Sequence, residues 1–167
     1  MWKDEISHLF FENKIKFHEL SDLGSLNSMK IGGKALILAQ PSDEDQLVFA
    51  LREARHIGAP FQVVGGMTNT LIFDGVFCGV LIKTSCIDSM NFTKNREVYA
   101  TCGASLASVV RGAAKRGIGG FSEMVGIPGT LGGAIYGNAG AHGRAISEDV
   151  VEVNVYDTIE NKKKTLT

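Results

Sequence analysis

The sequence has few cysteines, no excess of either charge and no long hydrophobic run. Its three cysteines form an odd set without a close pair, which fits a reduced cytoplasmic compartment better than a disulfide framework. The net charge of −1 gives no electrostatic reason to expect a nucleic-acid partner. No apolar stretch approaches the roughly 18 residues of a membrane-spanning helix, and residues 1–14 mix both signs of charge, which excludes a signal peptide. We therefore expect a cytoplasmic protein that binds neither membranes nor nucleic acid.

Several patterns typical of catalytic sites are also missing. The four histidines show neither the His-Glu-x-x-His spacing of zinc enzymes nor any grouping with the cysteines. The stretch GASLA at residues 103–107 lacks the second glycine of a hydrolase nucleophile elbow. Its Ser105 is better explained as a helix N-cap. The sequence therefore predicts no metal site and no hydrolase triad.

The chain is nevertheless long and apolar enough to form a hydrophobic core. It has 167 residues, of which 44% are hydrophobic and 21% charged, as in ordinary globular proteins. Hydrophobic periodicity predicts helices over residues 3–15, from a cap at Ser42 to about His56, and over 105–116. It predicts strands over residues 34–41, 61–66, 79–85, 97–103 and 149–158, with 162–167 as the start of a hairpin partner. This order of helices and strands indicates an α+β fold. Because the sequence stops within a predicted hairpin, we expect the chain to be a fragment.

Glycine is concentrated in residues 126–143, GIPGTLGGAIYGNAGAHG, where seven of eighteen residues are glycine. So many small residues leave the backbone uncovered, so that a flat ring system could lie against it. Pro128 is expected at the first position of a short helix, whose free N–H groups would favour an anion. Close packing of a helix on a sheet would need the same small residues. A flexible linker is excluded because four apolar residues in the stretch would need burial: Ile127, Leu131, Ile135 and Tyr136.

A second glycine-rich stretch, VVGGMTNTLI at residues 63–72, follows a predicted buried strand. Successive backbone N–H groups in such a turn can form a concave anion site. Thr68 and Asn69 could add side-chain donors to phosphate oxygens. The stretch is neither a Walker loop nor a G-x-G-x-x-G fingerprint. A tight turn between two strands explains the same residues.

These two stretches, in this order, resemble the FAD-binding half of the UDP-N-acetylenolpyruvoylglucosamine reductase family of bacterial peptidoglycan synthesis. The resemblance begins at NSMKIGG, residues 27–33, and runs through the two glycine-rich stretches, so it covers nearly the whole chain. It implies an α+β fold, a vanillyl-alcohol-oxidase or PCMH-type FAD-binding domain made of two α+β subdomains. We expect the first subdomain at residues 1–58 and the second at 59–167. The second would be incomplete at its C-terminus, and the family's substrate domain would be absent.

The resemblance also assigns cofactor-binding residues. Those expected at the FAD pyrophosphate are Gly65, Gly66, Met67, Thr68, Asn69 and Thr70. Those expected along the flavin and its ribityl chain are Ile127, Pro128, Gly129, Thr130, Gly132 and Gly133, and the cleft is completed by Asn138, Ala139, Gly140 and Gly143. Met67 stands where the family usually has glycine, and a positive φ at that position would cost methionine about 1–3 kcal/mol.

In the family, NADPH reduces the flavin, which then reduces the enolpyruvyl group of a nucleotide-sugar substrate to form UDP-N-acetylmuramate. An arginine, a serine and a glutamate assist this reaction in the family, and none of them has a counterpart in this chain. We therefore expect no catalytic residue here and no activity from the chain alone. Two alternatives stay open: a stand-alone, non-catalytic flavin- or nucleotide-binding module, and another oxidoreductase of this flavin-domain type with a separate substrate subunit. The unfinished hairpin also predicts association through exposed strand edges.

Overall fold

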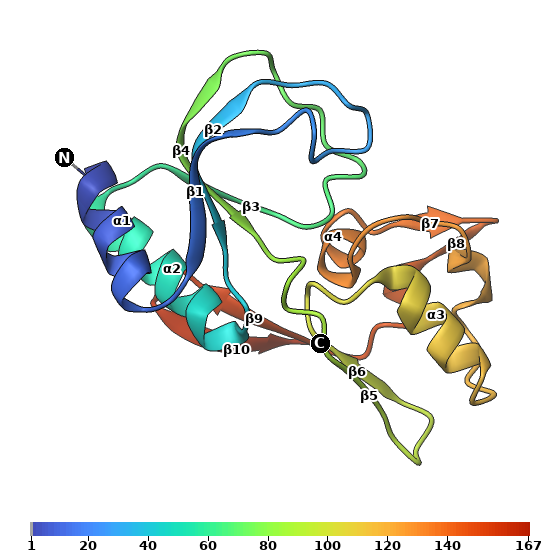
Figure 1. Ribbon diagram of the computed structural model, residues 1–167. Helices are drawn as coiled ribbons and strands as arrows, with labels where there is room; N and C mark the ends of the chain where they lie inside the picture. Colours follow the sequence, from blue (N-terminus) through green and yellow to red (C-terminus); the bar gives the residue numbers. More distant parts are fainter. Residues whose placement is uncertain (1) are drawn as a thin grey trace.

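The computed structural model describes residues 2–167, and a four-stranded mixed sheet organises their first half (Figure 1). The strand order is β1-β2-β4-β3, with β1 (Lys16–Asp22) antiparallel to β2 (Lys34–Gln40). Both β2 and β3 (Phe61–Val64) pair in parallel with β4 (Val76–Lys83). Helix α2 (Glu44–Ile57) forms the crossover from β2 to β3, two strands that run in the same direction on either side of β4.

The two faces of this sheet are buried in different ways. Helices α1 (Trp2–Glu12) and α2 cover one face, where the first hydrophobic core forms (Figure 1). Loops cover the opposite face, where Leu38 and Leu81 belong to a second core. A register irregularity between Ala35 and Ile37 turns these two residues to opposite faces, so Ala35 joins the second core and Ile37 the first.

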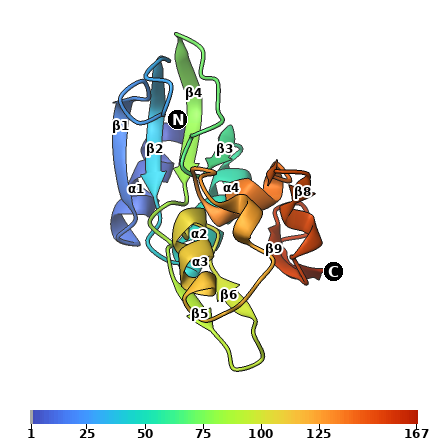
Figure 2. The ribbon, with the colours of Figure 1, turned by 90° about the vertical axis from the view of Figure 1, so that its right-hand side faces the viewer.

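The second half is built from short elements around a third core. Its helices are α3 (Leu106–Ala114) and α4 (Leu131–Tyr136), with single 3₁₀ turns η1 (Ser122–Met124) and η2 (Ile146–Glu148). Two hairpins belong to it: β5 (Met90–Phe92) with β6 (Val98–Ala100), and β7 (Gly140–Ala141) with β8 (Arg144–Ala145). A third hairpin, β9 (Val153–Asp157) with β10 (Lys162–Leu166), returns to the first half, where Tyr156 packs against the first core (Figure 1). Figure 2 shows α3 and the β5–β6 hairpin extending away from the four-stranded sheet. The core of this half contains Leu106, Val110, Met124, Ala134 and Ile146.

Most predicted elements are confirmed, with shifted boundaries. Helix α2 begins one residue later than predicted, because the Asp43 side chain, and not Ser42, accepts a hydrogen bond from the Gln46 N–H at 2.8 Å. The first helix ends at Glu12 because Lys14 adopts a left-handed φ of 56°. Strand β1 was not predicted, since it is a mostly exposed edge strand without a hydrophobic run. The hairpin predicted at residues 149–167 is confirmed as β9–β10.

The four-stranded sheet continues past residue 58, where the first subdomain was expected to end. Strands β3 and β4 lie after that boundary but pair with each other and with β2. A boundary at residue 58 would therefore divide one sheet, because the sequence patterns did not show that β2 and β3 both pair with β4. We propose that the first subdomain includes β4. Within residues 2–167, no helix has the length and apolar character needed to cross a membrane.

Candidate functional site

The two glycine-rich loops, residues 65–70 and 127–133, meet edge to edge in the fold (Figure 1). Thr68 Oγ1 donates a hydrogen bond to the Pro128 carbonyl at 3.2 Å. A Cβ atom built on Gly66 would lie 3.2 Å from the Gly129 Cα, so the two backbones are nearly in contact. Residues that the sequence places far apart therefore form one continuous backbone surface.

A third segment, residues 27–33, is hydrogen-bonded to the first loop. The Ser28 hydroxyl donates to the Thr68 carbonyl at 2.9 Å, and the Ser28 N–H donates to the Met67 carbonyl at 3.4 Å. Asn27, which is 1% exposed, donates its side-chain amide to the Ile31 carbonyl and so closes the segment on itself. The motif at residues 27–33 thus contributes a brace for the loop.

Met67 anchors the same loop to the sheet. It has a φ of 51°, so the position that the sequence analysis singled out does require the left-handed conformation. Its side chain is 2% exposed and belongs to the second core, with Leu38 and Leu81. The left-handed conformation costs a non-glycine residue about 1–2 kcal/mol, whereas burying a methionine side chain stabilises by about 1.5–3 kcal/mol. Burial therefore offsets the strain.

The backbone N–H groups of the first loop are free. None of those from Gly65 to Thr70 donates a hydrogen bond to another residue in the described part of the chain. The carbonyls of Met67 and Thr68 are already occupied by Ser28. A loop with unused donors and occupied acceptors presents positive partial charge, which is the character of an anion-binding turn.

Helix α4 begins later than predicted. Pro128 is not its first residue; Thr130 is the N-cap, and its hydroxyl accepts from the Gly133 N–H at 3.3 Å. The N–H groups of Leu131 and Gly132 are also occupied, because they donate to the carbonyls of residues 104 and 102, each at 2.8 Å. The prediction of free N–H groups in this first turn is therefore wrong. Within the second loop, the N–H groups of Gly129 and Thr130 stay free.

The segment at residues 102–104 forms a wall against α4 that sequence reasoning missed. A Cβ on Gly132 would lie 2.8 Å from the Cys102 Cβ, so close packing, the alternative considered above, accounts for this glycine. Burial raises the pKa of the Cys102 thiol. A Cβ on Gly103 would lie 2.0 Å from the Thr84 carbonyl oxygen. In the sequence, the small residues Gly103 and Ala104 were the feature that could have indicated this close packing.

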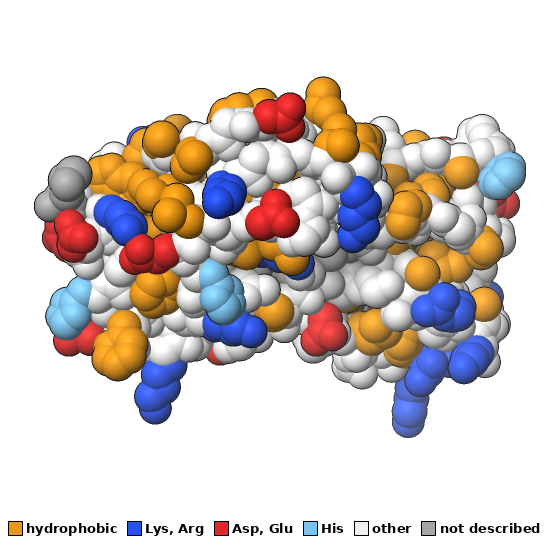
Figure 3. All heavy atoms as spheres, turned by 45° about the horizontal axis from the view of Figure 1, so that its top comes forward, with side chains coloured by type: hydrophobic (Ala, Val, Ile, Leu, Met, Phe, Trp, Pro, Cys, Tyr) orange, Lys and Arg blue, Asp and Glu red, His pale blue; other side chains and the backbone are white. Residues whose placement is uncertain are grey.

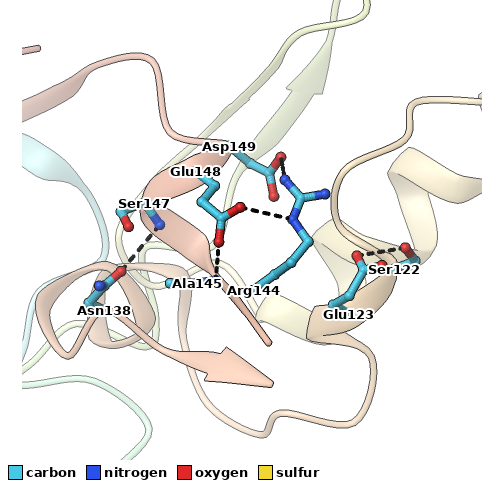
Figure 4. Close-up of polar contacts among 8 residues, drawn as sticks. All are labelled: Ser122, Glu123, Asn138, Arg144, Ala145, Ser147, Glu148 and Asp149. Carbon is cyan, nitrogen blue, oxygen red and sulfur yellow. Dashed lines mark hydrogen bonds and ion pairs between the residues drawn. The ribbon is translucent and has the colours of Figure 1, made fainter. Parts of the chain in front are cut away.

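The last candidate residues lie in the turn that follows α4. Asn138, with a φ of 43°, accepts a hydrogen bond at its Oδ1 from the Ser147 N–H at 3.2 Å (Figure 4). The Ala139 carbonyl accepts from the Ile146 N–H at 2.9 Å. Gly140 begins the β7–β8 hairpin, and Gly143, with a φ of 83°, forms its turn. This hairpin is therefore fastened at its base to η2.

Figure 3 shows a hollow between the two halves whose floor is mostly backbone and uncharged polar atoms, with charged side chains at its rim. Ile127, Leu131 and Ile135 pack against the third core, which excludes a flexible linker, but Tyr136 is 93% exposed, so its predicted burial is wrong. Among residues 2–167, no group of three or more His, Cys, Asp or Glu side chains could hold a metal ion.

Comparisons with known proteins identify the family and the fold of this chain. Residues 35–158 match the FAD binding domain family. The chain is 40% identical over 135 residues to the UDP-N-acetylenolpyruvoylglucosamine reductase of Synechococcus sp. (strain JA-3-3Ab), covering 81% of this chain and 43% of that protein. The structure of UDP-N-acetylenolpyruvylglucosamine reductase (MurB) from Thermus caldophilus is similar, with a TM-score of 0.69, 22% identity and coverage of 91% of this chain and 52% of that one. A solvent-stable cholesterol oxidase has a TM-score of 0.68 at 18% identity, over 92% of this chain and 33% of its own.

These likenesses confirm the expected α+β fold of the PCMH type. The chain spans about half, or less, of the length of the relatives that it matches. The shared part includes both glycine-rich loops, since the family match runs from residue 35 to residue 158.

Proposed function

Since this chain belongs to the FAD binding domain family, we propose that it is the FAD-binding portion of a UDP-N-acetylenolpyruvoylglucosamine reductase. One observation carries the proposal: a loop with free N–H donors lies directly against a second loop in which three of the seven residues are glycine. The first feature suits a pyrophosphate, and the second suits a flat ring system.

The residues fit the two ends of the cofactor differently. For the pyrophosphate, we propose the backbone N–H groups of residues 65–70. The Asn69 side chain, which is exposed and makes no hydrogen bond to another described residue, can serve as an additional donor. Thr68 cannot serve in the same way, because its hydroxyl already donates to Pro128. Its role is to hold the two loops together.

For the flavin and the ribityl chain, we propose the second loop and the turn after α4. The free N–H groups of Gly129 and Thr130 are the available donors. Residues whose side chains are small or absent allow close approach: Gly129, Gly133, Ala139, Gly140 and Gly143. Ile127 lies half-buried beside them and would shield the ring from water.

FAD would supply the redox chemistry by which reducing equivalents from NADPH reach an enolpyruvyl group on a nucleotide sugar. The residues of this chain bind and orient the cofactor. We propose no catalytic residue among them, so the chain alone would not reduce the substrate. The remaining catalytic groups would come from outside the 167 residues.

A visible absorption spectrum tests the proposal. The purified chain is incubated with FAD and freed of excess, and retained bands between about 350 and 470 nm are expected. Gly66→Val should abolish retention, because its side chain would fill the junction with Gly129. Gly119→Val is the matched control, since nothing lies within 4 Å of a Cβ at that exposed position. No retention by the unaltered chain, or equal retention by both variants, would defeat the proposal.

A non-catalytic nucleotide-binding module is the second candidate. It is favoured because this chain itself provides all the free N–H groups of residues 65–70 that would bind a pyrophosphate. Such a module would bind ADP nearly as well as FAD, since the two share a pyrophosphate. The proposed function requires that FAD bind more tightly than ADP. Titration of both ligands separates the candidates, and enolpyruvyl reduction by the 167-residue chain alone would exclude the second.

A further inference from the structure

Arg144 joins the β7–β8 hairpin to the residues that follow it (Figure 4). Its Nε contacts Glu148 Oε2 at 3.2 Å, and its Nη2 contacts Asp149 Oδ1 at 3.1 Å. The carboxylate of Asp149 raises the pKa of Arg144 further above its already high value. Arg144 is therefore a permanent cation at the centre of an ion network.

The network reaches Asn138, a residue proposed for the cofactor cleft. While Glu148 holds Arg144 through Oε2, its Oε1 accepts from the Ala145 N–H at 2.8 Å. These two contacts fix the start of η2, and the N–H of Ser147, the second residue of that turn, donates to Asn138 Oδ1. Because Asn138 has a positive φ, this bond helps to hold a conformation that is uncommon for residues other than glycine.

The Asp149 end of the network fastens the hairpin to the segment before η1. A Cβ built on Gly120 would lie 2.5 Å from Asp149 Oδ1, so the carboxylate packs directly on that backbone. Asp149 Oδ2 is buried and has no hydrogen-bond partner among the described residues. A buried carboxylate in this position needs a compensating cation, which Arg144 supplies.

Glu123, in η1, adds a further negative charge. A hydrogen bond from Ser122 lowers the pKa of Glu123, and the charge of Arg144 lowers it as well. Without Arg144, the carboxylates of Glu123, Glu148 and Asp149 would repel one another. Their charge would also oppose an anionic cofactor bound nearby.

We propose that Arg144 is a positioning residue for the cofactor. Through Glu148 and Asp149 it fixes Asn138 and the turn at residues 140–143 in the geometry that the flavin requires. This inference rests on the proposed function, since it concerns the same cleft. It adds a residue that the resemblance to the reductase family did not assign.

Fluorescence titration with FAD tests the proposal in the full chain. Arg144→Gln should weaken FAD affinity by about tenfold and shift the visible bands of bound flavin. Arg144→Lys keeps the charge but loses the two-pronged geometry, so it should recover part of that loss. Adding Asp149→Asn to Arg144→Gln should also restore affinity in part, because it removes the unpaired carboxylate.

Lys164→Gln is the matched control. Lys164 contacts Asp157 and Glu160 in the β9–β10 hairpin, so the change breaks an ion network of the same kind away from the cleft. Its FAD affinity should equal that of the unaltered chain. If the unaltered chain binds FAD and Arg144→Gln loses no more FAD affinity than the Lys164→Gln control, the inference about Arg144 is wrong and the proposed function is unaffected. No FAD binding by the unaltered chain would overturn it together with the proposed function.

Discussion

The Thr130 hydroxyl occupies the space that a side chain on Gly65 would need: a Cβ atom built on Gly65 would lie 2.2 Å from Thr130 Oγ1. Thr130 is 6% exposed, and the same hydroxyl caps α4 through Gly133. The hydroxyl cannot turn away without losing the cap. The two glycine-rich loops can therefore meet only because residue 65 has no side chain.

We expect Gly65→Ala to lower the free energy of unfolding by about 1–3 kcal/mol, the usual cost of overpacking, and to abolish FAD retention. Thr130→Ala alone should cost about 1 kcal/mol through the lost cap. In the Thr130→Ala background, alanine at position 65 should cost less, because the next nearest atom, the Cβ of residue 130, lies at 3.4 Å. Urea unfolding of the four proteins measures this coupling. Strictly additive effects would contradict the steric argument.

Met67 gives a second prediction. Met67→Gly loses a buried side chain, worth about 1.5–3 kcal/mol, and recovers the strain of a left-handed methionine, about 1–2 kcal/mol. Glycine also gains freedom in the unfolded chain, which costs about 0.5–1 kcal/mol. The net expectation is a loss of about 1–2 kcal/mol in the free energy of unfolding, measured with urea. FAD retention should fall as well, because the loop loses its anchor in the second core.

Leu71→Gly is the control for Met67→Gly. Leu71 lies in the same loop region but is 77% exposed, so its removal takes away little buried surface. We expect a stability change clearly smaller than that of Met67→Gly. If the two changes had equal effects, or if Met67→Gly stabilised the chain, the anchoring role of Met67 would be wrong.

The sequence singled out the two candidate loops but did not show that they meet. Periodicity located α2, α3 and the β9–β10 hairpin, and glycine content singled out both loops. The contact of Thr68 with Pro128 could not be predicted, because spacing along the chain does not show which loops meet. Pro128 was misplaced for a similar reason: its fixed φ suits a first helical turn, but the Thr130 hydroxyl provides a stronger cap two residues later.

The first strand illustrates a different limit. β1 is an edge strand whose residues are mostly exposed, so it lacks the hydrophobic pattern from which strands are predicted. Its partner β2 has four buried residues within its seven and was predicted correctly. The Arg144 network was also invisible in the sequence, since opposite charges four residues apart are common on surfaces. Only the packing of Asp149 on Gly120 makes this network part of the fold.

Asp157 predicts how stability depends on pH. A side-chain hydrogen bond from Lys164, with further ones from the backbone of Glu160 and Ile159, holds the pKa of Asp157 far below its usual value of 3.8. The folded chain therefore binds this proton less readily than the unfolded chain. The stabilisation is fully present above about pH 5 and is lost as the pH falls through the carboxylate range. Asp157→Asn should flatten this acid limb of a plot of Tm against pH, and an unchanged limb would show that the contact is too weak to matter.

Thr68 yields the sharpest test of the junction between the loops. Thr68→Val keeps the shape of the side chain but removes the donor to the Pro128 carbonyl. A lost neutral hydrogen bond costs about 1 kcal/mol, which corresponds to roughly a fivefold weaker affinity for FAD. The unpaired carbonyl would also leave the second loop free to move from the first. Fluorescence titration with FAD measures the change.

Thr68→Ser separates the hydrogen bond from the rest of the side chain. Serine keeps the hydroxyl that donates to Pro128 and loses only a methyl group, so its FAD affinity should stay close to that of the unaltered chain. Ser28→Ala removes the hydroxyl that donates to the Thr68 carbonyl, and it should weaken FAD binding by a smaller factor than Thr68→Val does. If the Thr68→Val and Thr68→Ser variants bound FAD equally well, the hydrogen bond between the loops would not contribute to the site. The free N–H groups of residues 65–70 would then be held in place by Met67 and Ser28 alone.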